Sequence, residues 1–216
     1  MDENNNSYVS VDNVLYTKDM KLLINCPGGR IEGLNIPNGV TTIGWEAFAG
    51  CSALENIILP ESLVTIGLSA FANCKISSII IPQNVQNIDY SIFSSCDDLT
   101  DITVSEDNKY FASADGILYS KDLKTLIIYP AGKDNSIIAI PDFVSRINQH
   151  AFYTCDKITS VTIPSSIEHI ESPISSACWN FDEIIVDEDN PNYASVDGVL
   201  YTKDMSTLLR CPEGRN

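Results

Sequence analysis

Proline recurs along this chain at nearly constant intervals. Pro37, Pro60 and Pro82 are 23 and 22 residues apart, and Pro141 and Pro164 are again 23 residues apart. Five cysteines keep step with the prolines: Cys51, Cys74, Cys96, Cys155 and Cys178. Two residue types repeating together indicate an internal repeat, and a repeat of this length predicts stacked coils that form a solenoid.

The repeating unit reads Leu-x-x-Ile-x-Ile-Pro, then Val-x-x-Ile-Gly, then Ala-Phe-x-x-Cys, as in residues 54–74 and, with variations, 76–96. Alternation places the two isoleucines of the first segment on one face and the residue between them on the other. Proline then ends the strand without loss of a ladder hydrogen bond. The pattern predicts two short strands followed by one turn of α- or 3₁₀-helix. Four phenylalanines are expected to line up along one axis: Phe48, Phe71, Phe93 and Phe152.

A single unit does not bury enough apolar surface to fold alone. It buries about six apolar side chains, at roughly 1.5–3 kcal/mol each. Ordering more than about twenty residues costs about 1–2 kcal/mol apiece in backbone entropy. Stacked units share a continuous core and pair their strands in parallel, through connections that are expected to be right-handed.

A second module occurs three times, at residues 8–19, 111–122 and 193–204, and each copy continues to a proline followed by glycine two residues later. Two apolar runs around a Lys-Asp turn predict a β-hairpin. The terminal copies are expected to cap the solenoid, and the middle copy to be an insertion. We divide the single domain, 1–216, into an N-terminal hairpin cap (1–30), three repeats (31–98), a strand with a hairpin insertion (99–133), two repeats (134–180) and a strand with a C-terminal hairpin cap (181–216).

The repeat, interleaved with Asp-Gly-x-Leu-Tyr-x-Lys-Asp hairpins, resembles the BspA-type, or treponemal-class, leucine-rich repeat from about Tyr8 to Gly214. The resemblance implies a right-handed solenoid of α/β to mainly β character with a parallel sheet on its concave face. It also implies a secreted or cell-surface bacterial protein associated with adhesion. Ile92 and Ile174 depart from the Ala-Phe pair, and Pro173 is expected to distort its turn.

Charge excludes several classes of partner. The chain has 13 Lys and Arg against 29 Asp and Glu, a formal net charge of −16. Nucleic-acid phosphates require clustered basic residues, and anionic membranes repel a chain of this charge. No apolar run approaches the roughly 20 residues of a membrane span. The start, Met1-Asp2-Glu3, does not resemble a signal peptide, so the extracellular location depends on the resemblance alone.

The seven cysteines are expected to be structural. Five share one repeat position beside an apolar residue, which predicts buried thiols packed on the unit before. Cys26 and Cys211 occupy matching hairpin positions and are expected to pack in the same way. Disulfides between successive units would be strained. Without a Cys-x-x-Cys pair, and with two histidines, a zinc site is not expected, and we predict no metal or other cofactor.

No catalytic constellation is visible in the sequence. His150 and His169 lie at variable repeat positions and are expected on the surface, and no Gly-x-Ser-x-Gly elbow occurs. We therefore predict that the chain is not an enzyme. The acidic clusters at 106–108 and 187–190 are expected to be solvated loops; calcium binding is the alternative, although EF-hand spacing is absent. Trp179 follows a core cysteine and is expected near the core.

The outward row of the predicted sheet is the candidate binding surface. Isoleucines at matching outward positions, among Thr and Ser, favour contact with a protein or glycan. The resemblance implies that this partner belongs to a host or another cell. The alternative is that β-branched residues merely suit a strand. We predict a non-catalytic binding module, the alternative being a spacer or a cell-wall- or glycan-binding accessory domain of a larger surface protein. The candidate contact residues are Asn35, Asn56, Ile58, Ser78, Ile80, Asp101, Thr103, Ser160, Thr162 and Ile185.

Overall fold

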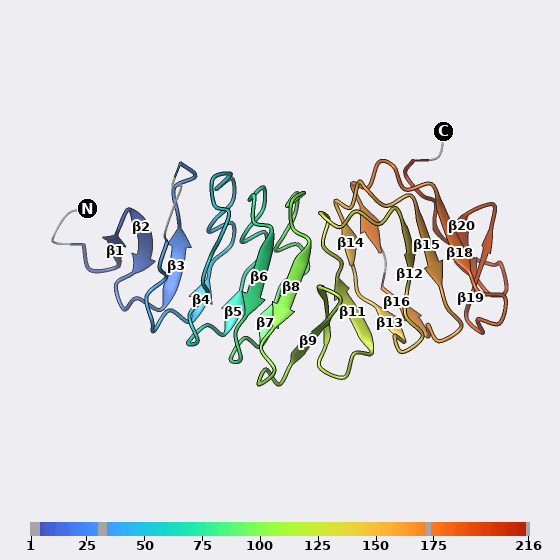
Figure 1. Ribbon diagram of the computed structural model, residues 1–216, viewed down its shortest axis with the longest axis horizontal. Helices are drawn as coiled ribbons and strands as arrows, with labels where there is room; N and C mark the ends of the chain where they lie inside the picture. Colours follow the sequence, from blue (N-terminus) through green and yellow to red (C-terminus); the bar gives the residue numbers. More distant parts are fainter. Residues whose placement is uncertain (1–4, 30–33, 172–173, 215–216) are drawn as a thin grey trace.

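The computed structural model describes residues 5–29, 34–171 and 174–214. They form an elongated solenoid whose coils stack along the long axis, with hairpins at its two ends (Figure 1). The predicted leucine-rich repeat solenoid is therefore confirmed. The departure at Pro173 lies outside the described residues.

The first row of strands contains the Leu-x-x-Ile-x-Ile-Pro segments. Within each half of this row adjacent strands pair in parallel, coil on coil, and the row begins with a bridge between Asn35 and Ile58. Inward side chains of each strand are buried and outward ones are mostly exposed, as alternation requires. The strands of this row are β6 (Ser78–Ile81), β8 (Asp101–Val104), β12 (Ile137–Ala139), β15 (Ser160–Ile163) and β18 (Glu183–Val186).

A second row contains the Val-x-x-Ile segments, where each coil contributes a two-residue parallel strand. The backbone at the end of each strand also binds its neighbour: Gly67 N–H donates to the carbonyl of Ile43 at 2.9 Å. The strands of this row are β4 (Thr42–Ile43), β5 (Thr65–Ile66), β7 (Asn87–Ile88), β13 (Arg146–Ile147) and β16 (His169–Ile170).

The Ala-Phe-x-x-Cys segments contain no helix in the described residues, so the predicted helical turn is wrong. The N–H of Phe48 donates to the carbonyl of Ala70 in the next coil at 2.8 Å, whereas the N–H of Cys51 donates to Phe48 within its own coil at 3.0 Å. Because some amides of the segment bind the adjacent coil, a continuous local helix cannot form. In the second half the corner is extended enough to form β14 (Phe152–Tyr153) paired with β17 (Ser175–Ser176).

Each predicted hairpin is a meander of three antiparallel strands, which we call a hairpin module. The additional turn is Asp12-Asn13 in the first copy and Asp-Gly in the other two, a strong hairpin signal that the sequence analysis did not use. The last strand then joins the second row by parallel pairing, β3 with β4 and β11 with β13. The modules are β1 (Tyr8–Val11), β2 (Val14–Thr17) and β3 (Leu22–Asn25); β9 (Phe111–Ala114), β10 (Ile117–Ser120) and β11 (Thr125–Ile128); and β19 (Tyr193–Val196), β20 (Val199–Thr202) and β21 (Leu208–Arg210).

Aromatic rings stack along the core. The ring centroids of Phe48 and Phe71 are 5.2 Å apart, and those of Phe71 and Phe93 are 5.8 Å apart. Phe152 continues the row in the second half beside Tyr129, at 5.6 Å. The rings stop there because Ser175 occupies the register position of Phe152 in the next coil. The predicted alignment along an axis is thus found within each half of the solenoid.

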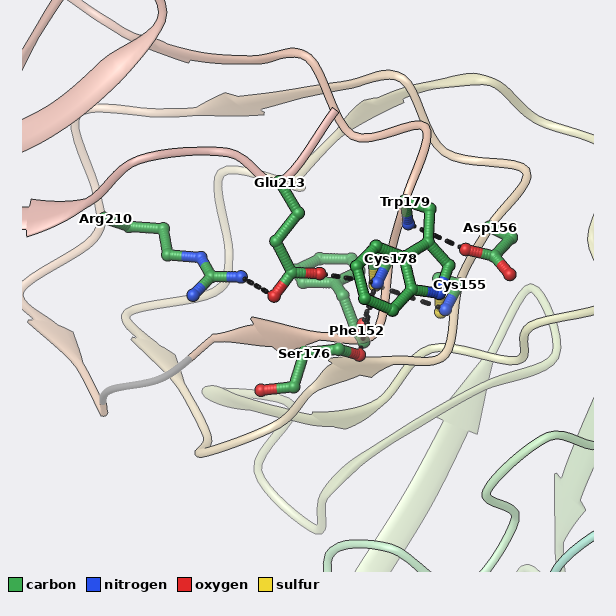
Figure 2. Close-up of polar contacts among 8 residues, drawn as sticks. All are labelled: Phe152, Cys155, Asp156, Ser176, Cys178, Trp179, Arg210 and Glu213. Carbon is green, nitrogen blue, oxygen red and sulfur yellow. Dashed lines mark hydrogen bonds and ion pairs between the residues drawn. The ribbon is translucent and has the colours of Figure 1, made fainter. Parts of the chain in front are cut away.

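The buried cysteines form a ladder of hydrogen bonds between coils. Each of the five repeat thiols lies against a carbonyl of the segment stacked before it, as in Cys96 to Phe71 at 3.0 Å and Cys178 to Phe152 at 2.7 Å (Figure 2). All seven cysteines are free, and six are buried. The prediction of buried structural thiols is correct for the five repeat cysteines and for Cys26.

Cys211 is exposed, so the prediction that it packs like Cys26 is wrong. In the first hairpin module the next coil covers Cys26, whose N–H donates to the carbonyl of Ala47 at 2.7 Å. No described coil follows Cys211. Trp179 is also exposed rather than near the core; its backbone N–H donates to a carboxylate oxygen of Asp156 at 2.8 Å (Figure 2).

The thiol ladder predicts a loss of stability in alkali. Burial raises the pKa of Cys96 from 9.0 to about 12. The folded state therefore keeps this thiol protonated while the unfolded chain ionises, so its contribution is complete below pH 9 and falls between pH 9 and pH 12. We expect a slope of about 1.4 kcal/mol per pH unit from this thiol in the free energy of unfolding, measured by urea titration with reductant. Cys96→Ala should reduce the slope by that amount; an unchanged slope would contradict the assignment.

Candidate binding face

The outward residues of the first row form the candidate binding face. Ile58, Ile80 and Ile185 are 78%, 63% and 42% exposed, so three large apolar side chains face solvent at matching positions. The hydroxyl of Thr103 donates to a carboxylate oxygen of Asp101 at 2.7 Å, which fixes a polar pair beside Ile80 in the next strand. Of the other candidate residues, Asn35, Asn56 and Ser78 are exposed, and Asp101 and Thr162 are half-buried.

Ser160 does not belong to this face. It is only 4% exposed, because it lies in register between the longer side chains of Ile137 and Glu183. Ile137 occupies the same repeat position one coil earlier and is 67% exposed. Ile137 was not among the predicted contact residues, although alignment of the coils places it at that outward position.

The face is interrupted between its two halves. The second hairpin module closes the edge of β8: the N–H of Ile102 donates to the carbonyl of Gly116 at 2.9 Å, and the N–H of Val104 donates to the hydroxyl of Ser113 at 3.0 Å. Figure 1 shows β9 and β11 between β8 and the strands of the second half. As a result β8 and β12 do not pair with each other.

The edge of β12 that faces this interruption has no strand partner in the described residues. The carbonyl of Ser136 accepts from Ser160, and the N–H of Ile140 donates to Thr162, so both face β15. Backbone groups alternate in direction along a parallel strand. The amides and carbonyls of the two outward residues of β12, Ile137 and Ala139, therefore point to the free edge. This edge is able to pair with an added strand.

A groove of about 270 Å³ lies along this free edge. Its walls include Ile117, Leu126 and Pro141, and its polar lining residues include Asp115 and Lys133. The ammonium of Lys133 donates to the backbone carbonyl of Asp115 at 2.8 Å. The carboxylate of Asp115 takes no part in this hydrogen bond. The groove thus combines apolar walls, a strand edge and charged groups.

Two tyrosines also line the groove. Burial raises the pKa of Tyr119 to about 12, and burial likewise raises the pKa of Tyr129, so both remain neutral phenols at physiological pH. The hydroxyl of Tyr129 is buried without a hydrogen-bond partner among the described residues. Such an arrangement suits an extended peptide with an apolar side chain.

The two histidines lie in different surroundings. His150 packs between Tyr90 and Tyr153, with ring centroids 5.0 and 5.3 Å away, and burial lowers its pKa. It is therefore only partly at the surface, whereas His169 is exposed as predicted. Across the described ranges, no group of three His, Cys, Asp or Glu side chains is placed to hold a metal ion. The same residues contain no helix capable of crossing a membrane.

The acidic loops contain a structural residue that sequence reasoning missed. Asn108 and Asn190 are fully buried, and their amide groups donate to carbonyls of the preceding coil. In the loop after β18, the carboxylate of Asp187 accepts the N–H of Asp189 at 2.9 Å. The sequence feature that predicts this residue is an asparagine three residues before the aromatic residue that begins each hairpin module.

Comparison with known proteins identifies the family. The BspA type leucine rich repeat region matches residues 26–133 and 131–196, in six copies. The chain belongs to the BspA-type leucine-rich repeat family. This BspA-type chain matches none of the curated proteins.

Solved structures support the same assignment. A leucine rich cell surface protein from Faecalibacterium prausnitzii is 33% identical, with a TM-score of 0.59 over 69% of this chain and 40% of that one. Pneumococcal vaccine antigen PcpA, at 23% identity, and a leucine-rich repeat protein from Eubacterium ventriosum, at 22%, share the fold. Their TM-scores are 0.60 and 0.54, over 76% and 69% of this chain and 38% and 52% of theirs. The BspA-type chain therefore spans about 40% to half of these proteins.

The unpartnered hydroxyl in the groove leads to a stability prediction. Tyr129→Phe removes a buried polar group that has no partner, so we expect the free energy of unfolding to be unchanged or to rise by about 1 kcal/mol. Urea unfolding measures this change, with Tyr110→Phe as an exposed control. A loss of more than about 1 kcal/mol would show that the hydroxyl makes a stabilising contact.

Proposed function

We propose that this BspA-type domain is a non-catalytic binding module that holds a protein through the sheet face. The observation that carries the proposal is the alignment of Ile58, Ile80 and Ile185 on one face, interrupted by a groove with a free strand edge. Neither the name of the family nor that of the similar F. prausnitzii protein includes a catalytic activity.

The groove favours a protein ligand over a glycan. A free strand edge offers backbone amides and carbonyls that an extended peptide is able to pair with, while an apolar side chain enters the pocket beside it. The strands of the face are already ordered by their neighbours in the coil stack. Little ordering entropy is therefore lost on binding, which favours affinity.

The negative charge of the chain further restricts the kind of protein that the face is expected to bind. The net charge is −16, and Asp101 and Glu183 belong to outward positions of the face. A ligand with an apolar centre and a rim of Lys or Arg complements these groups. We expect its association rate to fall as salt concentration rises, because rim charges mainly steer encounter.

The proposed setting is adhesion outside the cell, with a host or other-cell surface protein as the partner. The support is the family and the similar F. prausnitzii structure, which is that of a leucine rich cell surface protein. A glycan partner is the alternative, and it predicts binding that ignores the free edge of β12.

Substitution at the apolar row tests the proposal. The triple variant Ile58→Lys, Ile80→Lys and Thr103→Lys should lose binding to a panel of immobilised extracellular-matrix proteins by at least about tenfold, since it places three charges in the contact centre. Surface plasmon resonance measures binding, and circular dichroism checks folding. Trp45→Lys changes an exposed residue outside the row and should bind as the parent does. Equal binding by the triple variant would refute this face as the contact.

A further inference from the structure

The second and third hairpin modules hold the coil in front of them through the same three groups. Asn108 donates from Nδ2 to the carbonyls of Pro82 and Val85, at 2.8 and 3.0 Å. Asn190 repeats this contact with Pro164 and Ile167, at 2.8 and 3.2 Å. In each module the asparagine Oδ1 also accepts two N–H groups at the start of the first strand.

The other two groups close the edge of the preceding strand. Ser113 and Ser195 each accept an N–H through the hydroxyl, from Val104 and Val186, both at 3.0 Å. The carbonyls of Gly116 and Gly198, at the first turn, each accept another N–H at 2.9 Å. The two later modules thus bind a coil in the same way.

The first hairpin module carries the same set of groups, and no coil precedes it among the described residues. Asn5 accepts the N–H groups of Ser7 and Tyr8 at 2.9 and 2.8 Å, as its two counterparts do. Its amide group has no acceptor among the described residues, however, and it is half-buried where Asn108 and Asn190 are fully buried. Ser10 and Asn13 stand at the hydroxyl and carbonyl positions, and both are exposed. Asn13 even keeps the left-handed turn conformation, with φ of 63° against 72° and 73° for the glycines.

The other side of each hairpin module is the side on which its last strand meets the following coil. There the first two modules bind a coil, whereas the third module has none among the described residues. Leu23 and Leu126 accept an N–H from the following coil through their carbonyls, at 2.8 and 2.9 Å, and both are buried. Leu208 occupies this position in the third module and is 56% exposed. Cys211, which matches the covered Cys26, is exposed as well.

We propose that the hairpin module is a two-sided connector, and that both ends of this solenoid are joining surfaces for a further coil of the same repeat. The occupant at the first module presents two strand amides and two turn carbonyls, as the coils before Asn108 and Asn190 do. The occupant at the third module adds a parallel strand to β21. A hairpin module does not fit either surface, because the groups at each surface match those that bind a coil on the two sides of the second module. This role differs from the end caps expected from the sequence, and it does not depend on the proposed function.

Extension of the full chain at its C-terminal side tests one surface. Residues 135–180 are copied after Asn216, which continues the spacing found after the second module. Reaction of Cys211 with a thiol reagent, read by peptide mass spectrometry, should be fast in the parent and slowed at least about tenfold in the extended chain. In the control, Val144→Asp and Ile147→Asp are placed in the appended copy alone, and Cys211 should stay reactive.

Extension in front of Asn5 tests the other surface, with a copy of residues 54–107. Asn5→Ala should change the melting temperature of the parent by less than about 1 °C and lower that of the extended chain by about 2–4 °C. An appended coil that leaves Cys211 reactive, or an Asn5→Ala effect that is equal in both chains, would overturn the proposal. Protection of Cys211 in the parent that grows with protein concentration would also overturn it, because the occupant would then be a second copy.

Discussion

The fold depends on hydrogen bonds that cross from one coil to the next. Each coil offers amides, carbonyls and a thiol whose partners lie in its neighbour, as in Phe48 N–H to Ala70 and the Cys96 thiol to Phe71. The stacked rings of Phe48, Phe71 and Phe93 add apolar contact along the same axis. A coil taken alone would leave these groups unsatisfied, so stability belongs to the stack and not to its units.

The same interdependence decides which features of the fold are predictable from the sequence. Spacing of proline and cysteine was enough to predict the solenoid, because every coil must present its core residues at the same place. The helical turn was wrong because the sequence pattern does not show that the N–H of Phe48 is bound by Ala70 in another coil. Cys211 was wrong for a related reason: its position matches that of Cys26, but burial depends on the coil that follows.

The binding face was less accessible to sequence reasoning. Outward positions follow from alternation, so Ile58, Ile80 and Ile185 could be placed correctly. The burial of Ser160 depends on the size of its neighbours across two strands. The groove beside β12 exists only because a hairpin module interrupts the row, and no local pattern reports the space left between segments that are far apart in sequence.

The modest rise of each coil has a mechanical consequence for a domain of this kind. Coils repeat about every 23 residues, and neighbouring strands are about 4.8 Å apart. A coil pulled straight would reach about 80 Å, at about 3.4 Å per residue. Tension along the axis would therefore release the chain one coil at a time, and each release would lengthen it more than tenfold locally. A pull on the two ends of the solenoid would therefore lengthen it in steps, each about the length of one straightened coil.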